Sequence, residues 1–133
     1  MIETTVTVRS KLLWPNLSAW SAILRSSRFE VIKVLDTGPI TNHVNFARNS
    51  LGQFAYVTVG GLNLVKVFRS EDLEQVAAIE TGAVPHGLWP SGDGTRIYVG
   101  LENADAAAAI DTLENKVIAT IPVGLTVASD RTE

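Results

Sequence analysis

Histidine is the residue type in this chain with the widest catalytic and binding chemistry, and it occurs only at positions 43 and 86. An imidazole can act as a general base, bind a metal or haem iron, or donate a hydrogen bond to an anionic ligand. Each histidine stands at the start of a run of residues typical of a β-strand. The alternative is a structural histidine that repeats along the chain and bonds a neighbouring strand. His43 and His86 are therefore the first candidates for a site.

Several polar residues are predicted to lie at the same end of the strands as the histidines. With them they form a candidate ligand-binding rim of Asn42, His43, Asn45, His86, Asn103 and Asp105. Asn and Asp also form turns by bonding their own backbone, which is the simpler explanation for Asn63, Asn103 and Asp105. Asn42 and Asn45 stand beside His43 outside any predicted hairpin, so the turn explanation does not cover them.

Other catalytic and binding motifs are missing from the sequence. There is no cysteine, which excludes disulfides, thiolate nucleophiles and thiolate metal sites. Glu71, Asp72 and Glu74 fall in an outer turn and Asp93 in a glycine hairpin, so no catalytic carboxylate pair is indicated. The serines lack a nucleophile-elbow sequence, and Gly92-Asp-Gly94 lacks the length and the helix of a phosphate loop. We predict no catalytic residue, no metal site and no cofactor.

The composition indicates a folded domain rather than a disordered chain, with 46% apolar and 19% charged residues among 133. The formal charge is −3, and the 11 basic residues are spread thinly. No basic patch could neutralise a run of phosphates, so we expect no nucleic-acid partner. The apolar run at 12–24 is too short to span a bilayer, and Pro15 interrupts it. It also lacks the flanking residues of a convincing secretory signal.

A repeated pattern positions the candidate residues. Nine-residue segments of similar pattern end at Gly38, Gly82 and Gly124, which are 44 and 42 residues apart. Between these glycines a histidine, a Tyr-Val pair and an aliphatic residue recur in the same order. His43 and His86 are thus expected at equivalent positions of two units. A period of about 42 residues is typical of one blade of a β-propeller and of WD40-like repeats.

Each unit is predicted to form four short strands, because β-branched and aromatic runs alternate with turn residues. The predicted strands are 43–48, 54–59, 63–69 and 74–80 in one unit, and 86–90, 96–101, 105–111 and 116–121 in the next. Tyr56, Trp89 and Tyr98 are expected to fill the core between stacked blades. The predicted fold class is all-β, with four-stranded antiparallel blades of an incomplete β-propeller.

Short sequence segments within these units resemble the repeats of a known family. PHGLWPSGDGTRIYVG at 85–100, NKVIATIPVG at 115–124 and AYVTVG at 55–60 are similar to repeats of the YVTN-type (YncE-like) β-propeller family. The resemblance covers 30–124 and implies a closed propeller, usually of about seven blades. It implies a fold similar to the propellers of lactonases, quinoprotein amine dehydrogenases and the haem d1 domain of nitrite reductases. A periplasmic or extracellular location is implied by the resemblance alone.

The repeat divides the chain into an unpatterned lead-in at 1–29, an outer strand and connecting loop at 30–42, blades at 43–82 and 83–124, and the start of a further strand or a tail at 125–133. Two complete blades are fewer than the roughly four to eight of a closed propeller. The uncovered faces of the terminal blades indicate self-association or missing blades.

Three functional hypotheses remain open. The first is a non-enzymatic β-propeller repeat module that serves as a binding or scaffold surface, with a protein or small-molecule ligand at the channel rim. The second is a fragment of a propeller enzyme, lactonase-like or haem d1/quinoprotein-like, with His43 or His86 near a channel site. The third is an incomplete reading of a longer gene, without independent function. We favour the first, because it requires only the architecture that the residues indicate.

Overall fold

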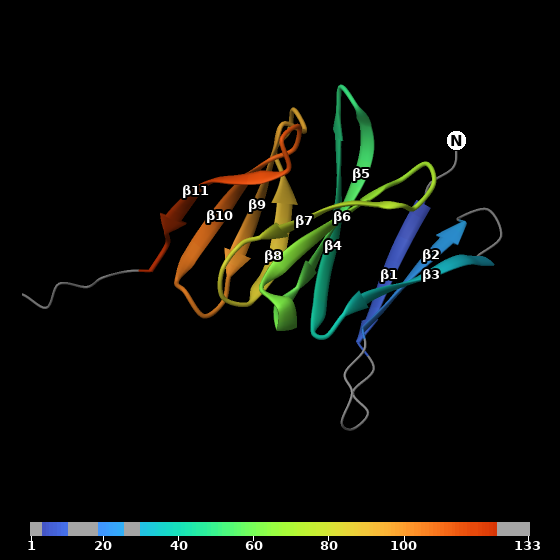
Figure 1. The fold of residues 1–133 in the computed structure, drawn as a ribbon, viewed down its shortest axis with the longest axis horizontal. Coiled ribbons are helices and arrows are strands. Elements are labelled where there is room, and N and C mark those ends of the chain that lie inside the picture. Colours follow the sequence, from blue (N-terminus) through green and yellow to red (C-terminus); the bar gives the residue numbers. More distant parts are fainter. Residues whose placement is uncertain (1–3, 11–18, 26–29, 125–133) are drawn as a thin grey trace, which may run out of the picture.

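Three antiparallel β-sheets, stacked in chain order, form the fold (Figure 1). The computed structural model describes residues 4–10, 19–25 and 30–124. Sheet A contains β1 (Thr4–Ser10), β2 (Ala19–Arg25) and β3 (Glu30–Gly38). Sheet B contains β4 (Thr41–Asn49), β5 (Gly52–Val59), β6 (Leu64–Arg69) and β7 (Gln75–Glu80). Sheet C contains β8 (Pro85–Pro90), β9 (Arg96–Leu101), β10 (Ala106–Asp111) and β11 (Lys116–Pro122).

The two four-stranded units predicted from the repeat are confirmed by sheets B and C, whose strands are paired in chain order. The residues 1–29, expected as a lead-in without strand pattern, contain β1 and β2 instead. β1 pairs antiparallel with β2, and β2 pairs with β3. Sequence periodicity missed this pairing because neither strand carries the repeat pattern. The segment 125–133, predicted as a further strand or a tail, lies outside the described residues.

Turn chemistry explains the recurring glycines. Gly38 ends β3 and Gly82 follows β7, with φ of 109° and 110°, a conformation that strains residues with a Cβ atom. In the β8–β9 turn, the Asp93 carboxylate accepts hydrogen bonds from the Ser91 hydroxyl and the Thr95 N–H. These bonds, the Ser91 bond foremost, lower the pKa of Asp93 to about 2. Side-chain bonding to the local backbone thus closes the hairpin.

Helical structure in the described residues is limited to the short 3₁₀ turn η1 (Gly60–Leu62) between β5 and β6. No helix within the described ranges has the length and apolar character needed to cross a membrane.

The main hydrophobic core lies between sheets B and C. Antiparallel partners share a face of a sheet, so Tyr56, Val67 and Ala77 point together toward sheet C. Leu88, Val99 and Ala108 face them from sheet C, and the buried members of both sets form one cluster. The Tyr56 side chain is fully buried, as predicted. Burial, with a smaller contribution from the Asp111 carboxylate, raises the pKa of Tyr56 to about 12.

A second, smaller core covers the opposite face of sheet B. It contains Ala55, Val57 and Phe68, with the half-buried Val44 and Phe46 packed against it. Leu35 of β3 also packs there, so sheet A covers this face. Sheet B is therefore enclosed between two neighbouring sheets.

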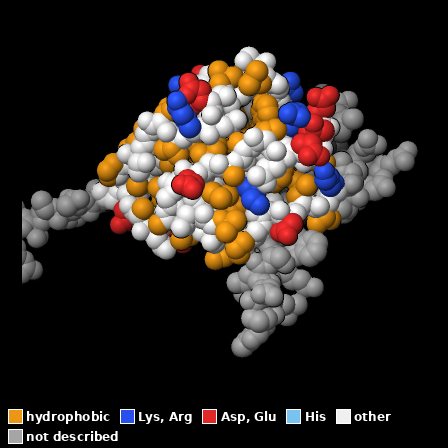
Figure 2. Space-filling model, viewed as in Figure 1, with side chains coloured by type: hydrophobic (Ala, Val, Ile, Leu, Met, Phe, Trp, Pro, Cys, Tyr) orange, Lys and Arg blue, Asp and Glu red, His pale blue; other side chains and the backbone are white. Residues whose placement is uncertain are grey.

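Sheet C has one covered and one uncovered face, and two residues that were predicted to be buried lie on the uncovered one. Trp89 and Tyr98 were expected between blades, but their side chains are 63% and 44% exposed. They are cross-strand partners on the face of sheet C that points away from sheet B. No further described sheet follows to cover them. Figure 2 shows apolar side chains exposed among the charged ones on one side of the molecule.

We expect Leu88→Ala to lower the free energy of unfolding by about 2 to 5 kcal/mol, because Leu88 is 1% exposed in the core between sheets B and C. Leu113→Ala is the control, since Leu113 is 47% exposed and should change stability by less than about 0.5 kcal/mol. Urea unfolding monitored by circular dichroism measures both. Equal stability of the two variants would contradict the described packing.

Candidate functional site

The inner strands β4 and β8 of sheets B and C lie side by side without forming a backbone ladder. Asparagine side chains connect them instead. The Asn42 Nδ2 donates to the carbonyl oxygen of Pro85 at 3.4 Å, and the Asn45 Nδ2 donates to that of Leu88 at 3.2 Å. These bonds satisfy carbonyls of the neighbouring strand, so both asparagines hold the two blades together. Both residues belong to the predicted rim, and the Asn45 Oδ1 also accepts a hydrogen bond from the Phe46 N–H at 2.9 Å.

A buried threonine on β5 fixes the two histidine-bearing segments relative to each other. The Thr58 Oγ1 accepts a hydrogen bond from the His43 N–H at 2.9 Å and donates to the carbonyl oxygen of His86 at 2.7 Å. Its side chain is fully buried. One hydroxyl thus connects the backbones of β4 and β8 at the level of the histidines. The alternative acceptor, the His43 carbonyl oxygen, is farther away at 3.3 Å.

Three aromatic rings meet at this position, and we call His43, His86 and Trp89 the ring cluster. The His43 and His86 ring centroids are 5.5 Å apart in an edge-on arrangement with an interplanar angle of 78°. The His43 and Trp89 centroids are 6.0 Å apart, with the planes tilted by 44°. All three side chains are exposed to solvent. The cluster therefore offers imidazole nitrogens and an indole face to a ligand from outside.

The strand register shows that the two histidines do not occupy equivalent positions, contrary to the sequence prediction. Val44 pairs with Val57 as Leu88 pairs with Val99, so Val44 and Leu88 are equivalent. Counting back, Asn42 corresponds to His86, and His43 corresponds to Gly87. The strands of the β8–β9 hairpin are shorter than those of the β4–β5 hairpin. Matching the order of features along the chain therefore aligned the two histidines wrongly. The rings meet because the strands are neighbours, not because the residues repeat.

A shallow hollow of about 390 Å³ adjoins the ring cluster, beside Trp89 and Gly100 of sheet C. It is lined by His86, Gly87, Trp89, Gly100, Leu101, Glu102 and Ala106. A Cβ atom at Gly87 would lie only 2.7 Å from the Trp89 Cζ3, so the indole can lie over this position only because it is glycine. The wall of the hollow is thus mostly apolar, with the exposed Glu102 at its side.

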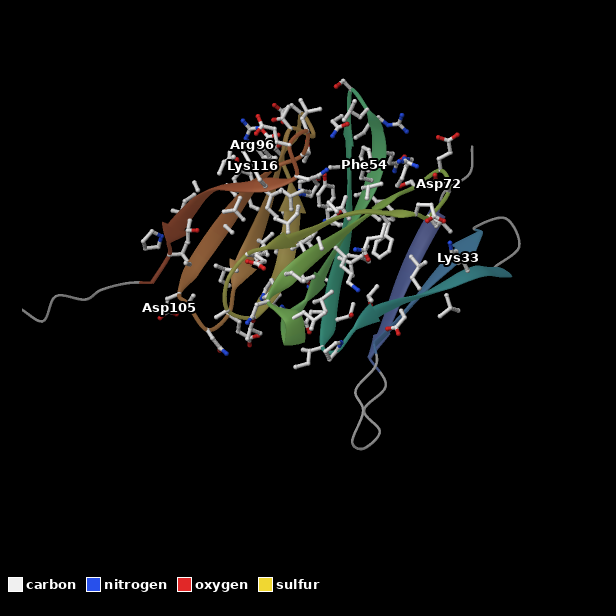
Figure 3. The ribbon with its side chains drawn as sticks, in the orientation of Figure 1. Lys33, Phe54, Asp72, Arg96, Asp105 and Lys116 are labelled. Atoms are coloured by element: carbon white, nitrogen blue, oxygen red, sulfur yellow. The ribbon has the colours of Figure 1, made fainter. Side chains whose placement is uncertain are left out.

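The remaining predicted rim residues lie in the β9–β10 turn. Asp105 has a φ of 44°, and its carbonyl oxygen accepts hydrogen bonds from the N–H groups of Val123 and Gly124. Figure 3 labels Asp105 at the end of sheet C opposite Arg96 and Lys116. Asn103 lies in the same turn. Neither residue lines the hollow. Asn63 has a φ of 56°, and its N–H donates to the carbonyl oxygen of Gly60, which supports the turn explanation there. Its side chain accepts a hydrogen bond from the N–H of the distant Val84.

Sequence reasoning missed Thr58 and Glu102, and it interpreted Trp89 as core. Thr58 carried one usable signal, a polar residue inside the apolar run AYVTVG, because a buried hydroxyl needs hydrogen-bond partners. The sequence around Glu102 carried no comparable signal. No group of three or more His, Asp or Glu side chains within the described ranges is arranged to hold a metal ion.

Comparison with known proteins identifies the fold. No protein-family model matches the chain, and no curated protein sequence matches it. Among solved structures, hydrazine synthase of Kuenenia stuttgartiensis matches 76% of this chain with a TM-score of 0.68 and 20% identity. Dihydro-heme d1 dehydrogenase NirN, in complex with DHE, matches 77% of it with a TM-score of 0.66 and 21% identity. Both are β-propeller proteins.

The chain has an incomplete β-propeller fold. The matched region spans 29% of the hydrazine synthase chain and 22% of the NirN chain, so this propeller segment is much shorter than either protein. β4 and β8 are the first strands of neighbouring four-stranded sheets, and His43 and His86 lie near their amino-terminal ends, whereas Trp89 lies near the carboxyl-terminal end of β8.

We expect Thr58→Val to reduce stability by about 1 to 3 kcal/mol, because it leaves the partly buried His43 N–H and His86 carbonyl without their shared partner. Thr58→Ser keeps the hydroxyl and is the control for this bridge. Urea unfolding gives the stability, and nuclear Overhauser contacts between the His43 and His86 rings report their spacing. A Thr58→Val protein with unchanged stability and ring contacts would show that the hydroxyl does not position the histidines.

Proposed function

We propose that this chain is a non-enzymatic β-propeller segment that binds a small ligand at the ring cluster of His43, His86 and Trp89. The proposal rests mainly on the contact between the two imidazoles, which remain open to solvent while one buried hydroxyl joins the backbones that carry them. Membership of the YVTN-type family, and the blade boundaries at 43–82 and 83–124, are parts of the same proposal.

The chemistry of the cluster favours a flat ligand with a hydrogen-bond acceptor. The exposed face of Trp89 can stack on an aromatic ring, an interaction worth about 0.5 to 1.5 kcal/mol beyond surface burial. The imidazole N–H groups of His43 and His86 can donate to a carboxylate or a carbonyl oxygen. A planar aromatic carboxylate combines both features, and the hollow beside Trp89 has room for one.

The other residues of the predicted rim have different roles in the proposed ligand binding. Asn42 and Asn45 already donate to β8 carbonyls, so they support the site by holding the strands together. Asn103 and Asp105, in the β9–β10 turn, would contact only a ligand that extends beyond the hollow.

We expect benzoate, used as a probe, to shift the backbone amide resonances of Gly87 and Gly100 in a saturable titration. Trp89→Leu and His86→Asn should each weaken binding by about fivefold or more, the effect of losing about 1 kcal/mol. Asn103→Ala is the matched control and should leave the affinity unchanged, because Asn103 does not line the hollow. Shifts that are insensitive to both ring-cluster variants would refute the proposed site.

An enzymatic role is the second candidate, in which His43 or His86 serves a cofactor within a larger propeller. It is favoured by the fold similarity to a dehydrogenase described in complex with DHE, and by two neighbouring exposed histidines. The similarity is limited to the fold, because only 21% of the aligned residues are identical. A lactonase-like role has no comparable observation in its favour.

Titration with haemin separates the two candidates. The binding proposal predicts no change in the Soret band that depends on the histidines. A Soret shift that appears in the wild-type chain and disappears in both His43→Ala and His86→Ala would favour the enzymatic role instead. His86→Ala alone, compared with His43→Ala, tells which imidazole is responsible.

A further inference from the structure

The two histidines of the chain lie against each other at the junction of sheets B and C. His43 is on β4 and His86 is on β8, and both side chains are exposed. The sequence has no other histidine and no cysteine. Imidazole and thiolate are the side-chain groups that bind transition-metal ions most strongly. The best ligands that this chain has for such an ion are therefore gathered at one point.

The spacing of the two rings fits two ligands of a single metal ion. Imidazole nitrogens bind Zn²⁺ at about 2.0 to 2.1 Å in a tetrahedral arrangement, which places two such nitrogens roughly 3.4 Å apart. Ring centres lie farther from the ion than the nitrogens do, so rings that share an ion have centroids about 5 to 6 Å apart. The His43 and His86 centroids are 5.5 Å apart. Because the χ2 preference of histidine is broad, both rings can turn a nitrogen toward a common point.

Hydrogen bonds between the strands fix the backbone beneath the histidine pair. The Thr58 hydroxyl joins the His43 N–H, at 2.9 Å, to the His86 carbonyl oxygen, at 2.7 Å. The preceding residues are also joined, because the Asn42 Nδ2 donates to the Pro85 carbonyl oxygen at 3.4 Å. An ion would therefore meet two imidazoles whose backbones already have a set separation. Such preorganisation reduces the entropy that is lost on binding.

The chemistry of the pair favours borderline transition-metal ions over hard ones. Imidazole suits Zn²⁺, Cu²⁺ and Ni²⁺, whereas Mg²⁺ and Ca²⁺ prefer oxygen ligands. The exposed Glu102 carboxylate lines the same hollow as His86, so the local charge favours a cation. No third His, Asp or Glu side chain in the described ranges completes a metal-binding group with the pair. Water, or an oxygen of a small ligand, would occupy the remaining coordination positions.

We propose that His43 and His86 form a two-histidine site for a divalent transition-metal ion, with Cu²⁺ bound more tightly than Ni²⁺ or Zn²⁺. This order is the general one for nitrogen ligands and first-row ions. The inference goes beyond the proposed ligand binding and does not require it, because the ion uses imidazole lone pairs and not the face of Trp89. A neutral imidazole that binds an ion through one nitrogen keeps its N–H on the other, so an ion and an anionic ligand can be bound together.

Isothermal titration calorimetry of the untagged chain with CuCl₂, ZnCl₂ and MgCl₂ tests the site. We expect one Cu²⁺ or one Zn²⁺ per chain, with Cu²⁺ at least about tenfold tighter, and no saturable binding of Mg²⁺. His43→Ala and His86→Ala should each weaken Cu²⁺ binding at least about tenfold, because one imidazole alone lacks the effective concentration of the second. Circular dichroism shows whether each variant is folded. A wild-type chain that binds Cu²⁺ no better than folded His43→Ala or His86→Ala would overturn the proposal.

Electron paramagnetic resonance of the Cu²⁺ complex distinguishes a site within one chain from an ion shared between chains. The wild-type spectrum should show coupling to two imidazole nitrogens, and the spectrum of each single variant should show coupling to one. Sedimentation velocity should give the same mass with and without the ion, because both ligands come from the same chain. Coupling to a single nitrogen in the wild type, or a mass that doubles with half an ion per chain, would contradict the two-histidine site.

Trp89→Leu is the matched variant that separates the metal site from the proposed ligand binding. Trp89 lies against His43, but its indole has no lone pair for an ion. Trp89→Leu should therefore bind Cu²⁺ within about threefold of the wild-type affinity while it loses affinity for benzoate. Loss of Cu²⁺ binding in Trp89→Leu would overturn the metal site. Failure of benzoate to bind a wild-type chain that binds Cu²⁺ would refute the proposed function and leave the metal site supported.

Discussion

Face-to-face burial of β-sheets is the interaction on which the rest of this structure depends. Strand residues alternate between two faces, and sheet B carries apolar side chains on both of them, such as Tyr56 on one and Val57 on the other. A sheet of this kind is stable in water only between two neighbours. Sheets A and C supply these neighbours, so each unit depends on the ones beside it.

Polar contacts act at one place between the blades, where β4 and β8 lie side by side. β4 and β8 form no ladder with each other, so side chains satisfy their facing groups. Asn42 and Asn45 do this from β4, and the Thr58 hydroxyl does it from inside sheet B. Because these groups bond to backbone, they leave the imidazole and indole rings free for other contacts. The scaffold and the candidate binding surface thus use different atoms of the same segments.

Sheets B and C show how one architecture can carry different chemistry. Equivalent positions hold Asn45 and Thr58 in sheet B but Trp89 and Gly100 in sheet C. The first pair joins blades, whereas the second forms part of an open hollow. The propeller fold constrains where strands lie and which face they bury, but it does not specify the function of the rim. The low sequence identity to hydrazine synthase and NirN fits this separation.

By itself, the sequence determined the local features of the protein. Alternating residues and turn glycines such as Gly38 and Gly82 specify strands and their ends, because backbone conformation and side-chain alternation depend on near neighbours. Only the tertiary structure decided burial and proximity. Tyr56 and Tyr98 look identical in the repeat, yet one is buried and the other is exposed, because among the described residues sheet B is followed by another sheet and sheet C is not. Likewise His43 and His86 meet through the packing of β4 against β8, a contact between residues that no periodicity links.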